Sequence, residues 1–442
     1  MKPNSPQLER FERLEGELKP SWVYPIRKAG IARFAEQGFP TLAHEDWRFT
    51  NVAPIVKLPF KPVVAPAQDG VSKEELSRFL FGKLPGHRLV FVNGIFVPSL
   101  SSGGGTTDGV VVSNLADALS KHRQLLEKHF GGGADRDGNA FSSLNTAFFQ
   151  DGAFVYLPDQ IILAEPVHVM FISTARETGT TTHPRNIFIA GANSGLTVLE
   201  SYVSTVDATY VTNAVTEIVA GENASMEHVK FQDESLSAYH IASIHAHLGA
   251  RSNVIAHSIA TGARLSRNSI RTKLAGKGLE CILNGLYLTK GEQLADHHMV
   301  VEHAEPNCNS HEYYNGILDG KSRGVFHGRI LVKQIAQKTD AKQTNKNLLL
   351  SDDATVDTKP QLEIYADDVK CTHGATIGQL NEEAIFYLRS RGLSVETARS
   401  MLIHAFAGEI IERVRHSEVR AELDKLVWER LEANPHVGEQ KG

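Results

Sequence analysis

The sequence has 442 residues, of which 41% are hydrophobic and 22% are charged, and its formal net charge is −5. This length predicts two or three domains, and the composition is typical of a globular protein. The slightly acidic balance argues against nucleic acid as the main partner, because nucleic-acid-binding proteins carry basic surfaces.

The sequence shows no sign of secretion or of a membrane span. Its first residues are polar and charged, and no run of eighteen apolar residues occurs anywhere in the chain. The cysteines are Cys281, Cys308 and Cys371, an odd number without a CxxC pair. This pattern favours a reducing compartment over a disulfide framework, so we expect a cytoplasmic protein.

Residues 1–145 are expected to form an N-terminal domain of mixed helices and short strands. Residues 88–97 predict a β-hairpin with Asn93 and Gly94 at its turn. Glycine runs at 103–105 and 131–133 are expected to be loops. Neither run has the Lys-Ser/Thr ending of a phosphate-binding loop or GxGxxG spacing, so we expect no nucleotide site of those kinds.

Residues 146–377 are expected to form the core domain, a parallel β-helix. Short β-branched runs alternate with turns, and the turn glycines lie at Gly191, Gly221, Gly249 and Gly276, at intervals of 30, 28 and 27 residues. One turn per near-constant interval is typical of a solenoid. A β-sandwich is the alternative, but sandwich strands have no reason to repeat a glycine turn so regularly.

Residues 378–442 are expected to form a C-terminal helical domain. The pattern predicts one helix over 382–390, a second capped by Ser394, and a third from about Glu418. The second helix carries an apolar stripe that includes Met401, Phe406 and Ile410. This stripe is a candidate docking surface for a partner, with packing inside the chain as the alternative.

Histidines gather at His297, His298, His303 and His311, close to Cys308. These residue types bind zinc or iron, but their spacing matches no established metal motif. Alternation along a strand also sends His297 and His298 to opposite faces. We therefore interpret the group as hydrogen-bonding histidines, and leave a metal site as the alternative.

Cys371 and His373 follow an alternating strand at 362–365. If the strand continues, both side chains lie on one face and Thr372 lies on the other. A thiolate and an imidazole suit iron, zinc or copper. Two donors do not close a four-coordinate site, so further ligands must come from elsewhere in the chain or from a partner. The alternatives are a structural pair and a catalytic cysteine, although side chains almost 7 Å apart fit the latter loosely.

Acidic residues at 352, 353 and 357 raise the question of calcium or of carbohydrate cleavage. The stretch lacks the glycine and the terminal glutamate of an EF-hand loop. We interpret it as a turn with a solvated edge.

Several longer stretches resemble the SufBD family of SUF iron–sulfur cluster assembly proteins, and within it the SufD branch. The resemblance covers nearly the whole chain and is dense from Phe326 to Ile411. The matching stretches are residues 45–50, 141–149, 326–330, 343–351, 359–364, 367–378 and 398–411.

The resemblance implies a right-handed parallel β-helix between helical terminal regions, in a scaffold subunit that is not an enzyme. It implies pairing with SufB through the β-helices and binding of the ATPase SufC through the C-terminal helices. It also implies that His373, beside Cys371, is a ligand for a transient iron–sulfur cluster at the SufB–SufD interface. A reduced flavin is associated with the family's whole complex, and no motif in this chain places it.

Gly374 favours SufD over SufB, which typically has an acidic residue after its Cys-x-His motif. Two other hypotheses remain open. One is a β-helix enzyme that cleaves carbohydrate, and the other is a homodimeric cluster carrier in which two copies of Cys371 and His373 complete one site.

Overall fold

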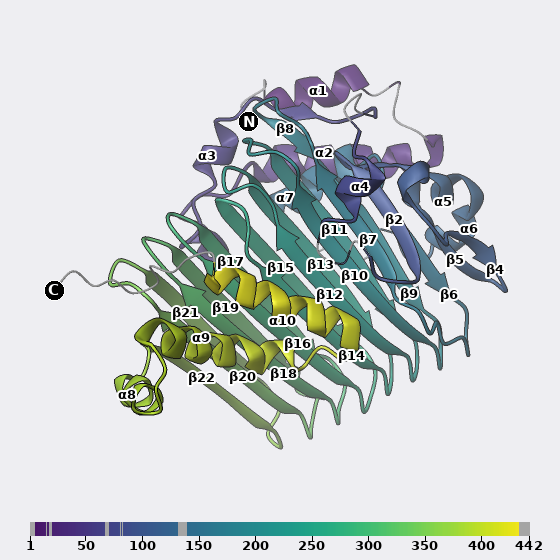
Figure 1. Ribbon diagram of the computed structural model, residues 1–442. Coiled ribbons are helices and arrows are strands. Elements are labelled where there is room, and N and C mark those ends of the chain that lie inside the picture. The colour runs from purple at the N-terminus through teal and green to yellow at the C-terminus, as the bar shows by residue number, and fades with distance from the viewer. Residues whose placement is uncertain are drawn as a thin grey trace.

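The computed structural model describes residues 5–14, 16, 20–66, 70–79, 81, 83–130 and 139–432. The core of the molecule is a β-solenoid made of two long sheets (Figure 1). From β9 onward its consecutive strands alternate between the sheets, so that each pair of strands forms one coil. From the pairing of β6 with β9 onward, the strands of the two ladders pair in parallel, whereas β6 pairs antiparallel with β5 on its other edge. The β-helical core expected from the sequence is confirmed.

We call the two sheets sheet A and sheet B. Sheet A contains β4 (Gly105–Thr107), β5 (Val110–Asn114), β6 (Ala153–Leu157), β9 (Arg185–Ala190), β11 (Val211–Ala220), β13 (Tyr239–Leu248), β15 (Leu265–Leu274), β17 (Leu294–His303), β19 (Arg323–Val332) and β21 (Thr355–Ile364), with β1 (Lys61–Pro62) and β8 (Thr180–Thr182) at its side. Sheet B contains β3 (Ile95–Phe96), β2 (His87–Val92), β7 (Val167–Ser173), β10 (Gly195–Ser204), β12 (Ser225–Asp233), β14 (Asn253–Ala260), β16 (Glu280–Thr289), β18 (Asn309–Leu318), β20 (Asp340–Leu349) and β22 (Lys370–Gly378).

The predicted glycine turns stack on one another from coil to coil. A Cβ atom on Gly221 would lie 2.8 Å from the backbone nitrogen of Ala192, in the turn of the previous coil. At Gly276 the corresponding distance to the nitrogen of Ala250 is 2.1 Å, which no side chain tolerates. The repeat therefore uses glycine because neighbouring backbones approach closely at each turn.

Alternate side chains of each strand point into the solenoid. The lumen is mainly apolar, as shown by columns of register partners such as Ile244, Ile270 and Met299 in sheet A. Methyl and aromatic groups removed from water in these columns supply the main stabilisation of the fold. The described lumen also contains polar side chains, and near the last coils these include Glu312 and Gln343.

The N-terminal region lies partly against sheet A and, around α4 (Lys73–Leu76), against sheet B, and it also extends both sheets. The predicted hairpin is confirmed, because β2 and β3 pair antiparallel across the turn at Asn93 and Gly94. In α7 the amide of Asn145 donates to the backbone oxygens of Pro184 and Asn213, both 2.8 Å away. The helices of this region are α1 (Pro6–Leu14), α2 (Tyr24–Gln37), α3 (Ala53–Val56), α4 (Lys73–Leu76), α5 (Leu115–Lys121), α6 (Arg123–Leu126) and α7 (Ala140–Phe148), with 3-10 helices η1 (Ser21–Val23), η2 (Glu45–Trp47) and η3 (Pro98–Leu100).

The C-terminal helices α9 (Val395–Ile411) and α10 (Ser417–Glu432) lie across the outer face of sheet B (Figure 1). Asn315 of β18 donates to the backbone oxygen of Phe406, at 2.9 Å, and Arg430 pairs with Asp233 of β12, at 2.5 Å. The helix α8 (Glu382–Ser390) has the bounds expected from the sequence, and Ser394 caps α9 as expected.

The described helices include none that is both long and apolar enough to cross a membrane. The glycine run at 103–105 leads into β4, whereas the run at 131–133 lies outside the described residues.

Candidate functional site

Cys371 and His373 lie on β22, the last strand of sheet B. Cys371 pairs in register with Ala341 of β20, and His373 pairs with Gln343. Both partners are buried on the inner side of the coil, so Cys371 and His373 share that inner side. The single-face arrangement expected from the sequence is therefore present, at the rim of the solenoid.

The other edge of β22 pairs with no strand among the described residues. The same holds for β21 in sheet A, so the two strands form an open end of the solenoid. Lys370 donates its backbone N–H to Thr339, at 2.8 Å, and in a parallel ladder alternate residues face the same neighbour. The backbone groups of Cys371, His373 and Ala375 therefore face the open edge.

Cys371 is half-buried and packs against apolar side chains of the last coils. Burial raises the pKa of its thiol, and the neighbouring carboxylate of Asp340 raises it further. The thiol is therefore protonated at neutral pH, unlike the thiolate of a catalytic cysteine. A metal would have to displace this proton in order to bind. His373, in contrast, is exposed at the rim.

A polar column lies behind His373 in the lumen. Glu312 of β18 and Gln343 of β20 are register partners, and the Gln343 amide donates to Oε2 of Glu312 at 2.6 Å. Glu312 is fully buried, and this burial raises the pKa of its carboxyl to about 7. A Cβ on Gly328 would lie 2.0 Å from the Gln343 amide nitrogen, so glycine leaves space for that side chain. Sequence reasoning missed this column, although its members recur at the coil interval.

The predicted histidine group does not converge on one point. His297 lies in the lumen between Tyr287 and Tyr314, with ring centroids 5.1 and 5.2 Å away. His303 contacts the hydroxyl of Ser310 at 2.8 Å, and His298 points away from the lumen. The opposite faces expected for His297 and His298 are thus observed. His297 packs between aromatic rings, whereas His303 makes a hydrogen bond inside the chain.

His298 instead meets two residues that sequence reasoning did not connect with it. Its register partner on β19 is His327, and their rings meet edge to face with centroids 4.2 Å apart. Asp46 of η2 approaches both, with Oδ1 3.7 Å from Nε2 of His298. One donor atom from each residue lies within 4.8 Å of the other two. The coil interval could have linked the two histidines, but nothing local could have linked Asp46 to them.

The apolar stripe of α9 is divided by the fold. Ile410 is buried in the core between α9 and sheet B, and Phe406 packs at the edge of that core. Met401 is 41% exposed. The preceding helix α8 exposes Phe386 and Tyr387, which are 73% and 57% exposed. On α8 and α9 the exposed large apolar residues are therefore Met401, Phe386 and Tyr387, whereas Ile410 packs in the chain's own core.

The acidic stretch after 351 is dispersed in the structure. Asp357 pairs with Arg323 at 2.5 Å, and Asp352 contacts the amide of Gln379. These contacts support the interpretation as a turn and a strand edge.

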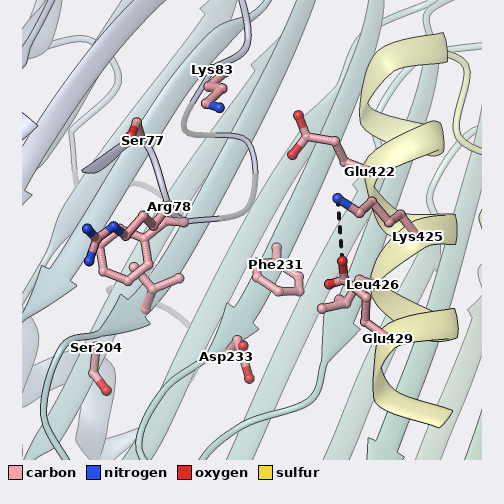
Figure 2. A pocket seen from close by; sticks show the side chains of 12 residues that line it. Ser77, Arg78, Lys83, Ser204, Phe231, Asp233, Glu422, Lys425, Leu426 and Glu429 are labelled. Atoms are coloured by element: carbon pink, nitrogen blue, oxygen red, sulfur yellow. Dashed lines mark ion pairs between the residues drawn. The ribbon is translucent and has the colours of Figure 1, made fainter. Parts of the chain in front are cut away.

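Figure 2 shows a hollow between α10 and the residues Ser77, Arg78 and Lys83, with residues of β10 and β12 as its floor. Lys425 pairs with Glu429 at its wall, at 3.4 Å. In sheet B, β12 is separated from β22 by five strand steps, or about 24 Å at the usual strand spacing. The hollow is thus remote from His373.

Comparison with known proteins gives the same family as the motifs. Residues 171–406 match the SUF system FeS cluster assembly, SufBD core domain, and residues 14–169 match the SufBD protein N-terminal region. A SufBD family iron–sulfur cluster assembly protein of Synechocystis sp. is 34% identical over 88% of this chain and 86% of its own length. The iron–sulfur cluster assembly protein SufD of Escherichia coli is 32% identical over 92% of this chain and 93% of its own length, and the chloroplastic protein ABCI7 of Arabidopsis thaliana is 30% identical over 93% and 88%. The chain therefore belongs to the SufBD family of iron–sulfur cluster assembly proteins, and it is similar to SufD over nearly its whole length.

Proposed function

We propose that the chain is a non-catalytic scaffold subunit of an iron–sulfur cluster assembly complex. In this proposal it pairs with SufB through the open end of its solenoid and binds the SufC ATPase through its C-terminal helices. His373 then helps to hold iron and the nascent cluster at the interface with SufB. The observation that carries the proposal is that the Cys-x-His pair lies on an unpaired edge strand.

The open edge of β22 supports pairing with a second solenoid. Unpaired strand edges present backbone donors and acceptors to another chain, and proteins normally cover or interrupt them. Ile377 on the same strand is 49% exposed and Ile364 on β21 is 40% exposed, which adds apolar area to the polar edge. We expect the same edge to pair two copies when the chain is isolated.

His373 supports a ligand site that is completed by the partner. Its imidazole is a borderline donor suited to iron, and the thiol of Cys371 stands two residues away on the same side. These two groups leave a four-coordinate site half empty. Strand pairing across the open edge would bring the partner's donors to the same rim.

The first test is His373→Ala in the complex co-expressed with SufB and SufC. We expect the variant complex to assemble normally but to contain little iron and acid-labile sulfide after anaerobic purification. Thr372→Ala is the matched control, because Thr372 lies on the same strand with its side chain on the other face. Normal cluster content in an intact His373→Ala complex would falsify the role given to His373.

A further inference from the structure

Asp46, His298 and His327 come from three separate segments and meet on the outer face of sheet A. The two histidines occupy one register position on neighbouring strands, β17 and β19. Asp46 comes from η2, near the other end of the sequence. Only the fold brings these three donors together, on the sheet opposite to the one that carries His373.

The segment that carries Asp46 is fixed to the sheet on both sides of that residue. Glu45 pairs with Lys359 of β21 at 2.5 Å. Trp47 is buried beneath the guanidinium of Arg267, which lies 3.8 Å from its ring centroid. Among the described residues, the ion-pair contacts of the Asp46 carboxylate are long, 3.7 Å to His298 and 3.9 Å to Arg271. Its backbone is thus held in place while its side chain is loosely engaged.

The two histidines are in the form that binds metal ions. Both are largely buried, and burial lowers the pKa of each imidazole, with nearby arginines lowering that of His298 further. Neutral imidazole is the metal ligand, so neither group has to lose a proton at neutral pH.

The neighbouring cations do not leave a net positive site. Arg267 pairs with Asp296, and Arg329 lies 3.5 Å from Glu363. Lys359 is occupied by Glu45, as described above, and Arg271 faces Asp46. Four carboxylates therefore balance four cations around the histidines, and a bound dication is not opposed by an excess of positive charge.

We propose that Asp46, His298 and His327 bind a divalent first-row transition-metal ion. Two imidazoles and one carboxylate are the ligand set of open iron(II) and zinc(II) sites, in which other positions are left to water or an incoming ligand. When metal–ligand bonds are near 2.1 Å, the ligand atoms on one ion lie about 3 Å from one another. The Asp46 side chain, which is 46% exposed, must therefore move closer to the histidines when the ion binds.

The identity of the cellular ion rests on the proposed function. A scaffold that builds iron–sulfur clusters has to receive iron(II), so we assign iron(II) to this site as an ion held apart from His373. The site itself stands on its own donors and can be tested without any cluster.

The test is a titration of the isolated full-length chain with cobalt(II) under anaerobic conditions, followed by the visible d–d absorption of the bound ion and repeated with iron(II) in equilibrium dialysis. We expect one strongly bound equivalent at this site. His327→Gln and Asp46→Asn should each weaken it by more than about tenfold, the loss expected for supporting partners of a metal site. His311→Gln is a control that should retain it.

Equal cobalt(II) affinity of the parent chain and of a folded Asp46→Asn or His327→Gln variant would contradict the proposed site. It would show that the histidine pair only packs edge to face. Asp46 is exposed enough that its substitution should leave the fold intact, which circular dichroism can verify. If substitution of Asp46 or His327 leaves cobalt(II) binding unchanged while the His373→Ala complex lacks clusters, the inference is overturned and the proposed function stands. If those substitutions weaken cobalt(II) binding while the His373→Ala complex has normal clusters, the metal site stands and the role proposed for His373 is overturned.

Discussion

Glu312 is a carboxyl group enclosed by the lumen, with Gln343 as its hydrogen-bond donor. Burial raises its pKa from 4.5 to about 7, so the folded protein holds this proton more tightly than the unfolded chain does. Stability contributed by the proton is fully present below pH 4.5 and is lost as the pH rises towards 7. The loss amounts to at most about 3 kcal/mol, at 1.36 kcal/mol per pKa unit.

Glu312→Gln should remove this pH-dependent loss, because the amide resembles the protonated acid. We expect the variant to melt at nearly the same temperature as the parent at pH 5 and at a higher temperature at pH 8. Thermal unfolding at the two pH values measures the difference. The exposed Glu292→Gln serves as the control, and a difference for Glu312→Gln that does not change with pH would contradict the assigned protonation.

Single residues of the candidate site differ in how well the sequence predicts them. The i and i+2 spacing of Cys371 and His373 is a local property of a strand, so it could be predicted. Glu312 and Gln343 lie on the same inner position of neighbouring coils. Predicting this contact requires the register between the coils, and the interval between turns alone does not give it. Asp46 reaches His298 through tertiary packing, which no periodic pattern encodes.

The glycine turn recurs once in each coil and stacks on the same turn of the coil before it. Its glycine could be predicted from the interval, but the conformation of the residue two positions later could not. Asn193, Asn223 and Arg251 occupy that later position with φ near 55°, in the left-handed region. Their side chains form a ladder in which Asn223 donates to Asn193 at 3.0 Å and Arg251 donates to Asn223 at 2.9 Å. Asparagine tolerates this conformation and supplies the bonding amide.

Gly276→Ala should destabilise the fold, because the new methyl group would meet backbone atoms of Ala250 that cannot move aside. We expect a loss of about 1–3 kcal/mol in the free energy of unfolding, the range for overpacked interiors. Gly249→Ala should cost less, because its nearest contact is 2.9 Å away. Gly374→Ala, with nothing within 4 Å, should change little. Urea unfolding measures all three, and equal values would contradict stacking as the reason for glycine.

The whole molecule has two covered sheet faces and one open end. N-terminal elements lie on the outer face of sheet A, and α9 and α10 lie on that of sheet B, whereas β21 and β22 end the solenoid without a described neighbour. The composition and the repeat predict a solenoid with helical ends. They do not predict which face each helical region covers, because that depends on packing between distant segments.

Two separate surfaces imply that the two proposed partners can be lost independently. Ala375→Pro removes a backbone N–H that faces the open edge and leaves the bonds to β20 in place. We expect it to abolish co-purification of SufB while SufC is retained. Met401→Asp combined with Phe386→Asp places charges on the exposed surface of α8 and α9 and should have the opposite effect. Quantitative pull-downs of the folded variants measure both, and parallel loss of SufB and SufC in either variant would contradict separate interfaces.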